Sequence, residues 1–264
     1  MITSSANEHI KALRKLEQAK DRRASGNFLA EGLKAVGQAF DSGAKIHELL
    51  VSPELLISEY GQSLIEQANK HKIPVLELSS SVFATLARKE KPQGIAALIT
   101  QKWLDPGSAF AQPGSFWVAL ESIQNPGNLG TILRTCDAVG ANGLILLDNS
   151  TDPYDPAAVK ASMGSIFTVP HFRADYPVFK AFLERSADLQ VIGTSDKAAK
   201  SAFEVAFPST VLLLLGSERQ GLSEQYISLC SQMLRIPMEG ACDSLNISVA
   251  AGVMLYQIYQ DRHK

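Results

Sequence analysis

Polar residues that could carry chemistry occur in three loops, each placed after an apolar run. Asn125-Pro-Gly-Asn128 leads to Arg134, the segment 216–221 contains Glu218, and the third loop ends in Ser244-Leu-Asn246. A guanidinium can bind a phosphate, a carboxylate can accept hydrogen bonds from a hydroxyl or an amine, and glycines let the backbone lie close to a ligand. Together these residue types indicate a ligand-binding site with an affinity for anionic groups.

Each residue also has a simpler interpretation, which stays open at this point. Arg134 by itself is typical of a solvated surface arginine, and Glu218 of a solvated loop carboxylate. Ser244 is a natural N-cap for the last helix, with Asn246 in its first turn, and capping alone would explain Ser244. The occurrence of three such loops along one chain favours a shared site.

The loops need a framework, and the hydrophobic pattern predicts an α/β fold with a mostly parallel sheet. The first loop lies between apolar runs at 116–120 and 143–148, which predicts strand, glycine turn, helix and strand. A run without alternation, such as 211–215, indicates a strand that is buried on both faces, as in parallel sheets. Ligands of such sheets bind at the carboxyl ends of the strands. The predicted strands are 116–120, 144–147, 167–170, 190–193, 211–215 and 234–237.

The front of the chain predicts a separate, smaller α/β domain. Strand-like and helix-like segments alternate from residue 27 to residue 100, without a phosphate loop or a catalytic cluster. A capping box at Ser5 and Glu8 predicts that a helix begins there, with an apolar face formed by Ile10, Leu13, Leu16 and Ala19. The segment 101–114 contains two Pro-Gly pairs and has the composition of a linker. We therefore expect a front domain at 1–100, a linker at 101–114 and a second domain at 115–264.

Charge gives a local and not a global indication of nucleic-acid binding. The formal net charge is −2, so a bound phosphate backbone must be held by local basic patches. The first helix has a basic face, and a second basic group precedes Gly94. A solvated amphipathic face explains the helix equally well. The candidate RNA-binding residues are Lys11, Arg14, Lys15, Arg22, Arg23, Arg88, Lys89 and Lys91.

Composition excludes several classes of protein. With 45% hydrophobic and 20% charged residues the chain is typical of a globular protein, and it has neither a membrane-length apolar run nor a signal-peptide pattern. Its three cysteines lie far apart without metal-ligand spacing, which indicates reduced thiols, no metal site and a cytoplasmic location. The dinucleotide-binding, Walker and serine-hydrolase motifs are all absent from the sequence.

The three loops closely resemble the signature motifs of the SpoU (TrmH) family, the RNA ribose 2′-O-methyltransferases of the SPOUT class. The second motif is Leu215-Gly-Ser-Glu218-x-x-Gly221-Leu, and the third runs from Ile236-Pro-Met-x-Gly240 to Ser244-Leu-Asn246. Lys160-Ala-Ser162-Met-Gly164-Ser165 also matches a family segment. Residues 27–100 are similar to the L30e-like substrate-binding domain that many members carry, so the resemblance covers almost the whole chain.

The resemblance implies a fold, a cofactor and a set of site residues. The fold is a mostly parallel sheet with a deep C-terminal trefoil knot, the methyl donor is S-adenosylmethionine, and the assembly is a homodimer. By position, Arg134 is the catalytic arginine, with Asn128, Glu218, Ser244 and Asn246 in the same motifs. The implied cofactor-binding positions are Thr194, Leu215, Gly216, Ile236, Leu245 and Asn246.

Two roles for Arg134 are open. A ribose 2′-hydroxyl must lose its proton as it attacks a methyl group, so the site needs orientation and stabilisation of a developing alkoxide. Free arginine has a pKa above about 12 and is a poor base at neutral pH. Our preferred hypothesis is that Arg134 holds the adjacent phosphate and polarises the hydroxyl, while the proton leaves to water or a neighbouring acceptor. The alternative is that Arg134 is itself the base.

Three interpretations of the function remain in competition. The preferred one is methylation of a ribose in RNA, with 23S rRNA favoured over tRNA because of the front domain. A second is a SPOUT enzyme that methylates a base, although the arginine-first motif and Ser244-Leu-Asn246 favour ribose. The third is an RNA-binding ribosome-assembly factor without turnover, which would have no reason to retain Arg134, Asn128 and Glu218 together. The sequence does not distinguish routine RNA maturation from antibiotic resistance.

Overall fold

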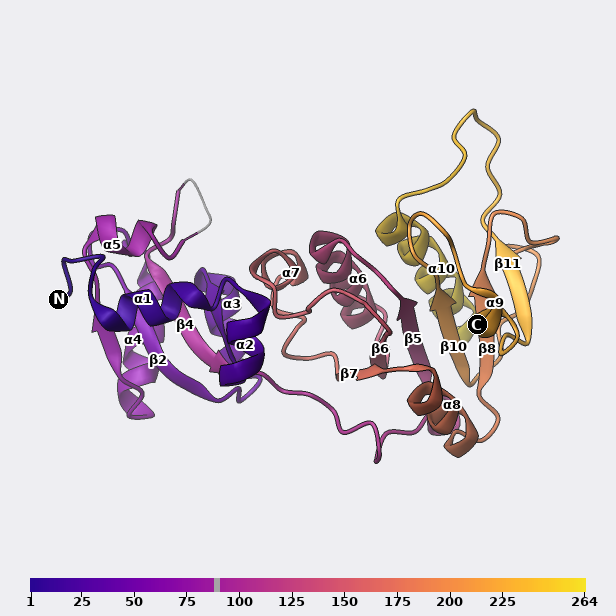
Figure 1. The fold of residues 1–264 in the computed structure, drawn as a ribbon, viewed down its shortest axis with the longest axis horizontal. Coiled ribbons are helices and arrows are strands. Elements are labelled where there is room, and N and C mark those ends of the chain that lie inside the picture. The colour runs from indigo at the N-terminus through magenta and orange to yellow at the C-terminus, as the bar shows by residue number, and fades with distance from the viewer. Residues whose placement is uncertain (88–90) are drawn as a thin grey trace. The chain divides into compact units, whose positions relative to one another are not determined.

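The computed structural model describes residues 1–87 and 91–264, which form two compact units (Figure 1). Unit 1 comprises Met1–Lys102 together with Asp152–Thr168, and unit 2 comprises Trp103–Thr151 together with Val169–Lys264. The boundary at Lys102 lies close to the expected one at residue 100. The difference is Asp152–Thr168, a segment that we assigned to the second domain and that packs as part of unit 1.

Unit 1 is built on a mixed sheet. Its described residues form four strands in the order β1-β4-β2-β3, in which only β2 and β3 pair in parallel. The strands are β1 (Asn27–Glu31), β2 (Ile46–Val51), β3 (Val75–Glu77) and β4 (Ile95–Thr100). The helices are α1 (Glu8–Lys15), α2 (Ala19–Ser25), α3 (Leu33–Asp41), α4 (Glu59–Lys70), α5 (Ser80–Ala84) and α7 (Pro156–Ser162).

The first helix forms as expected, but with a different cap. Ile10, Leu13 and Leu16 are buried against the sheet, in agreement with the predicted apolar face. The N-cap is Asn7, whose side chain accepts from the backbone N–H groups of the two residues after Glu8, and not Ser5. The helix is thus capped by the residue directly before it and not by the predicted capping box.

Arg22 is a core residue of unit 1, which corrects its assignment as an RNA-binding residue. Its side chain is 1% exposed and donates to Asp152 Oδ2 from Nε at 2.8 Å and from Nη2 at 2.7 Å. Nη1 donates to the carbonyl oxygens of Leu16 and Glu17, both at 2.8 Å. Every guanidinium nitrogen donates within the unit and the side chain is buried, so the guanidinium anchors the 152–168 segment and is not available to a phosphate.

Unit 2 contains the parallel sheet that the apolar runs predict. The described residues form seven strands in the order β7-β6-β5-β10-β8-β11-β9, and each neighbouring pair is parallel. The strands are β5 (Phe116–Glu121), β6 (Gly143–Leu147), β7 (His171–Ala174), β8 (Gln190–Thr194), β9 (Lys200–Ser201), β10 (Val211–Leu215) and β11 (Gln232–Arg235). The strand expected at 167–170 begins later, at His171, and β9 was not expected. The knot stays a prediction.

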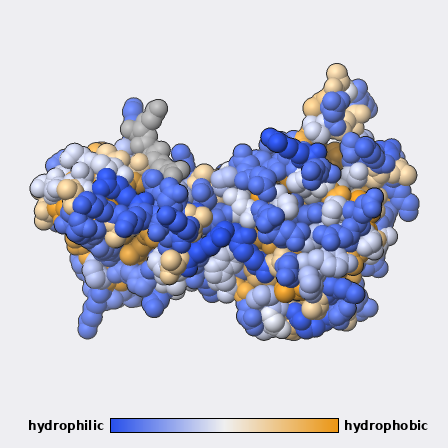
Figure 2. Space-filling view, in the orientation of Figure 1, coloured by the Kyte–Doolittle hydropathy of each residue, from blue (hydrophilic) through white to orange (hydrophobic). Residues whose placement is uncertain are grey.

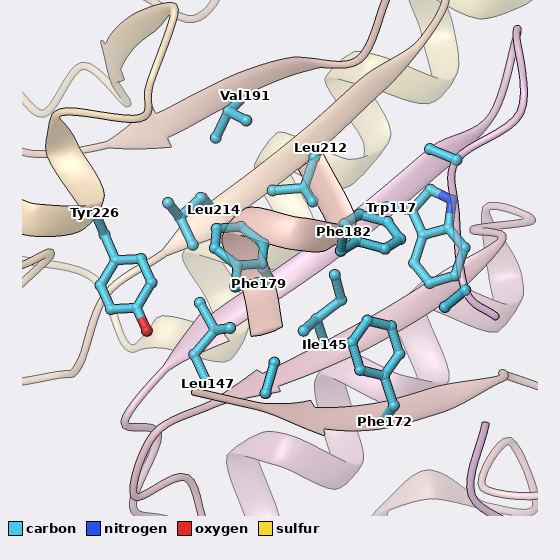
Figure 3. Close-up of a cluster of buried hydrophobic side chains, with 14 of the residues drawn as sticks. Trp117, Ile145, Leu147, Phe172, Phe179, Phe182, Val191, Leu212, Leu214 and Tyr226 are labelled. Atoms are coloured by element: carbon cyan, nitrogen blue, oxygen red, sulfur yellow. The ribbon is translucent and has the colours of Figure 1, made fainter. Parts of the chain in front are cut away.

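Helices cover both faces of this sheet. On one face alternate residues of β5, β6 and β10 pack against Phe179 and Phe182 of α8 and against Tyr226 of α9 (Figure 3). On the other face α6 and α10 pack against each other and against β6 and β10. The helices are α6 (Pro126–Ala138), α8 (Tyr176–Arg185), α9 (Glu224–Ile227) and α10 (Ile247–Arg262). Cover on both faces explains why strands such as β10 are apolar without alternation.

The segment expected to be a linker is part of the unit 2 fold. Ala109 and Ala111 are buried in the same hydrophobic cluster as Phe182, and the N–H of Ala111 donates to Ser186 Oγ at 2.8 Å. The N–H of Leu104 donates to the carbonyl of His171 at 2.9 Å. The two Pro-Gly pairs therefore shape turns on a packed surface rather than a free connection.

The visible surface is mostly hydrophilic, and two exposed apolar residues form a strip along α10. Hydrophilic residues cover most of the visible face of each unit, with small hydrophobic patches between them (Figure 2). Val249 and Tyr256 of α10 are 51% and 54% exposed, and they lie seven residues apart on one side of the helix. Within the described residues, no helix combines the length and the apolar character that crossing a bilayer requires.

Candidate active site

The first loop begins α6 at the carboxyl end of β5. Asn125 is the N-cap, and its Oδ1 accepts from the N–H of Gly127 at 2.8 Å and of Asn128 at 3.1 Å. Pro126 follows at the first helical position, where the lack of an N–H costs nothing. Leu129, Ile132 and Leu133 are buried. This packing fixes α6 and leaves Asn128 at the sheet edge.

The second loop is closed on itself after β10. The backbone groups of Ser217 and Gly221 exchange hydrogen bonds of 3.0 and 3.1 Å, which makes a tight turn that contains Glu218. A Cβ on Gly216 would lie 2.0 Å from the carbonyl carbon of Gly221, so only glycine fits there. Gly221 itself has φ +67°. The glycines of this motif are therefore explained by backbone geometry.

The third loop ends with a cap that differs from the expected one. Asn246 and not Ser244 is the N-cap of α10, and its Oδ1 accepts from the N–H of Ser248 at 2.9 Å. The carbonyl oxygen of Ser244 accepts from Cys242 Sγ at 2.9 Å. All residues from 239 to 246 are exposed, and the loop extends away from the sheet between β11 and α10 (Figure 1).

Hydrogen bonds join the three loops through side chains that the sequence singled out. Asn246 Nδ2 donates to Asn128 Oδ1 at 3.2 Å, and Asn128 Nδ2 donates to Glu218 Oε1 at 3.1 Å. One residue of each motif thus takes part in a chain of two bonds, over sequence separations of 118 and 90 residues. The partner of Glu218 in this chain is thus the neutral amide of Asn128.

A cavity of about 570 Å³ opens beside this chain, at the carboxyl ends of β8, β10 and β11. Five of the six expected cofactor-binding residues line it, the exception being Asn246. Glu218 and Ser244 line it as well. The cavity thus lies at the edge of the sheet where we expected a ligand to bind. The five residues are Thr194, Leu215, Gly216, Ile236 and Leu245.

Several lining residues were missed by the sequence reasoning. Ser195, Asp196 and Lys197 follow β8 directly, and Arg219 and Asp243 lie in the second and third loops. The rule that placed the site at the carboxyl ends of strands could have found the residues after β8. Nothing in their own types distinguishes them from an ordinary polar loop.

Arg134 lies apart from this cavity. Its residue is exposed on α6, and it does not occur among the described residues that line the cavity. Ile132, Leu133 and Cys136 face the core, so Arg134 lies off the buried stripe of α6. The structure of one chain brings Asn128, Glu218 and Asn246 together but leaves Arg134 at the surface.

Buried polar groups support the sheet edge next to the cavity. Glu121 ends β5, is 7% exposed, and accepts from the N–H of Ser223 at 2.9 Å through Oε2. Burial, followed by the neighbouring Asp148 carboxyl, raises the pKa of Tyr226 above its usual range. Tyr226 therefore stays neutral at physiological pH. The Glu121 bond holds the start of α9 against β5 and fixes the end of the second loop.

The remaining candidate RNA-binding residues differ in their surroundings. Lys11, Lys15, Arg23 and Lys91 are exposed, although Lys11 Nζ also pairs with Glu8 at 2.7 Å. Arg14 is half-buried and donates to the carbonyl of Ser5 at 2.7 Å. Arg88 and Lys89 lie outside the described residues. Across the ranges 1–87 and 91–264, no group of His, Cys, Asp and Glu side chains is arranged to hold a metal ion.

Two family profiles match the chain and together span most of it. The SpoU rRNA methylase family matches residues 115–256, and the MRM3-like substrate-binding domain matches residues 7–97. The second match agrees with the expected substrate-binding domain in front of the catalytic one.

Similar proteins cover nearly the full length. The chain is 28% identical to a 23S rRNA (guanosine(2553)-2′-O)-methyltransferase of Bacillus subtilis, over 97% of this chain and 98% of the relative. It is 29% identical to a 23S rRNA (uridine(2479)-2′-O)-methyltransferase of Streptomyces viridochromogenes, over 91% and 85%. A crystal structure of an AdoMet-bound rRNA methyltransferase from Sinorhizobium meliloti superposes with a TM-score of 0.89 at 35% identity, over 98% and 97% of the two chains.

The family assignment follows from these matches together with the three joined loops. The SpoU profile covers more than half of the chain, and the similar structure covers almost all of it. The hydrogen-bonded residues and the cavity lie within the matched region. The chain belongs to the SpoU rRNA methylase family, whose members with this architecture are S-adenosylmethionine-dependent RNA 2′-O-ribose methyltransferases.

Proposed function

We propose that this SpoU-family methyltransferase modifies a ribose 2′-hydroxyl in 23S rRNA. The observation that carries the proposal is the hydrogen-bonded chain from Asn246 through Asn128 to Glu218 beside the cavity. The two named relatives modify 23S rRNA, one at a uridine and the other at a guanosine. Since the bases differ, the class of RNA and not the base is the part of their specificity that we transfer to this chain.

The cavity fits the chemistry of S-adenosylmethionine. A volume of about 570 Å³ lies in the range of small-molecule sites, and the wall combines apolar Leu215 and Ile236 with charged Asp196 and Lys197. An adenosine group is compatible with the apolar part and an amino-acid group with the charged part. When bound, the cofactor supplies an electrophilic sulfonium methyl group.

Glu218 and Asn128 orient the reacting region. Because Glu218 Oε1 accepts from Asn128, the carboxylate is held at the rim of the cavity, where its second oxygen can accept from a ribose hydroxyl. Orientation of a nucleophile lowers the entropic part of the barrier. Arg134 supplies a permanent positive charge for the phosphate next to the modified ribose, in agreement with its exposure on α6. We favour this role over that of a base, because arginine remains protonated.

RNA is held by unit 1 as well as by the catalytic unit. Lys15 and Arg23 lie exposed on α1 and α2, and Lys91 is exposed after the undescribed residues. Arg22 is left out of this surface because its donors are engaged by Asp152 and two carbonyl oxygens. Contacts to phosphates release counterions, so we expect the affinity for RNA to fall steeply as salt is raised.

The protein acts as a homodimer in this proposal. The strip on α10 that contains Val249 and Tyr256 is apolar and more than half exposed. A second copy packed on this strip would remove that area from water. Sedimentation equilibrium tests the stoichiometry. The cytoplasmic location that the reduced cysteines favour also stays a prediction.

Methyl transfer from labelled S-adenosylmethionine to deproteinised 23S rRNA tests the function. We expect label in alkali-resistant dinucleotides, which only ribose methylation produces, and loss of that label in Arg134→Ala. Lys180→Ala, which removes an exposed cation from α8, is the matched control and should retain activity. Label confined to alkali-sensitive nucleotides would indicate a base methyltransferase and contradict the proposal. Label in tRNA instead would overturn the choice of substrate.

The alternative that the sequence left open is a ribosome-assembly factor without turnover. It would bind rRNA and show no transfer to naked or assembling particles, even with the cofactor bound. The residues joined at the cavity argue against it, because an RNA-binding protein gains nothing from a carboxylate held toward a cofactor site.

A further inference from the structure

The chain of hydrogen bonds that joins the three loops has a defined direction. A backbone N–H can only donate and an ionised carboxylate can only accept, and these two groups stand at opposite ends of the chain. The N–H of Ser248 fixes Oδ1 of Asn246, so Asn246 must turn its NH₂ group to Asn128. Asn128 must then turn its own NH₂ group to Glu218. The two ends of the chain of hydrogen bonds thus impose the same orientation on both amides, and the Ser248 end acts directly on Asn246.

Ser248 contributes a second donor at that end. Its hydroxyl donates to Asn246 Oδ1 at 2.6 Å, in addition to the backbone bond of 2.9 Å from the same residue. A carbonyl oxygen has two lone pairs, so the two bonds saturate Asn246 Oδ1. The amide of Asn246 is exposed, and water competes for an oxygen that has a free lone pair. The hydroxyl therefore removes a solvated alternative for the Asn246 side chain.

We propose that Ser248 is a positioning residue for methyl transfer, because its hydroxyl locks Asn246 and through it the Asn128–Glu218 pair at the cavity. Among the described residues Ser248 is not one that lines the cavity, and the hydrogen bonds that link it to Glu218 run through Asn246 and Asn128, so its effect passes through two amides. The inference rests on the proposed function, since it assigns Glu218 the orientation of the reacting group. It adds a residue outside the set that the three motifs indicated.

The effect is expected on turnover and not on binding. The loss of one neutral hydrogen bond is worth roughly 0.5–1.5 kcal/mol, which predicts a roughly two- to twelvefold lower kcat for Ser248→Ala. KM for S-adenosylmethionine and for RNA should stay within about twofold of wild type, because Ser248 is not among the described residues that line the cavity. Ser248→Thr keeps the hydroxyl and should restore most of kcat.

A double-mutant cycle with Asn128→Ala separates this role from a local effect on α10. When the Asn128 side chain is absent, the chain of hydrogen bonds to Glu218 is already broken. Ser248→Ala should then reduce kcat by less than about twofold. Ser228→Ala is the control, because the Ser228 hydroxyl donates to the carbonyl of Gln225 at 2.7 Å and takes no part in the hydrogen bonds that join the three loops. It should leave kcat unchanged.

Three results would overturn the proposal: an unchanged kcat in Ser248→Ala, an equal loss in both backgrounds, or a loss that Ser248→Thr does not restore. A wild-type protein without turnover would instead refute the proposed function. The positioning role is then judged by NMR of the side-chain amides. Resonances of both Asn246 and Asn128 must shift in Ser248→Ala and stay unchanged in Ser228→Ala, and a shift confined to Asn246 would refute the coupling.

Discussion

Arg22 gives the most demanding test of how the chain is held together. Its guanidinium is 1% exposed, donates twice to Asp152 Oδ2, and donates to the carbonyl oxygens of Leu16 and Glu17. The perturbation is Arg22→Met, which keeps an unbranched apolar stem of similar reach but removes all donors. The Asp152 side chain, 11% exposed, then remains as a carboxylate without its cation.

The magnitude follows from the loss of one partner of a buried ion pair, which costs about 3–5 kcal/mol. With a urea dependence of about 2 kcal/mol per M, the midpoint of unit 1 should fall by about 1.5–2.5 M. Arg23→Met is the matched control, because Arg23 is the adjacent arginine and is exposed. A surface change of this kind is worth less than about 0.5 kcal/mol.

Two optical signals distinguish the units. Both tryptophans, Trp103 and Trp117, lie in unit 2, so their fluorescence reports on that unit, whereas far-ultraviolet circular dichroism reports on both. We expect Arg22→Met to shift the circular dichroism transition and to leave the tryptophan transition in place. Adding Asp152→Asn should recover part of the loss, because the stranded charge is removed. A shift no larger than that of Arg23→Met, or strict additivity in the double mutant, would refute the reasoning.

Two further predictions concern the loops and the thiols. Gly216→Ala places a Cβ 2.0 Å from Gly221, so the affinity for S-adenosylmethionine measured by calorimetry should fall at least about tenfold, whereas Gly107→Ala, whose nearest neighbour lies at 3.4 Å, should bind normally. Wild-type affinity in Gly216→Ala would contradict the assigned turn. Burial raises the pKa of the Cys230 thiol to about 11, so at pH 8 iodoacetamide should modify exposed Cys242 at least about tenfold faster, as measured by mass spectrometry of digests. Equal rates would show that the region around Cys230 opens to solvent.

The hydrophobic pattern predicted the sheet of unit 2 well, because a strand that is buried on both faces has a continuous apolar sequence. Leu212 and Leu213 are both fully buried although they face opposite sides of β10, so the run lacks alternation. The strand that begins at His171 was predicted at 167–170, because those residues are partly apolar. They end in a proline, and the strand begins only after it. A two-residue strand such as β9 has too short a pattern to find.

Polar contacts between residues far apart in the sequence have no comparable pattern and were not predicted. Arg22 lies in a basic helix, and its charge suggested a solvent-facing role, whereas its partner Asp152 is 130 residues away. The same distance hid the membership of Asp152–Thr168 in unit 1. An isolated arginine and an isolated aspartate look alike on the surface and in a buried pair, so only the fold reveals the pairing.

The third motif shows how capping and function share the same atoms. Sequence reasoning assigned the cap to Ser244 and left Asn246 unexplained, but the Asn246 oxygen caps α10 while its NH₂ group bonds to Asn128. A serine hydroxyl could cap a helix equally well, yet it carries a single O–H and lacks the separate donor and acceptor ends of an amide. An asparagine is required where one side chain must both cap the start of a helix with its oxygen and donate to a neighbouring side chain with its NH₂ group. The two roles are therefore not alternatives at Asn246, and the cap is the reason that the bond to Asn128 has only one direction.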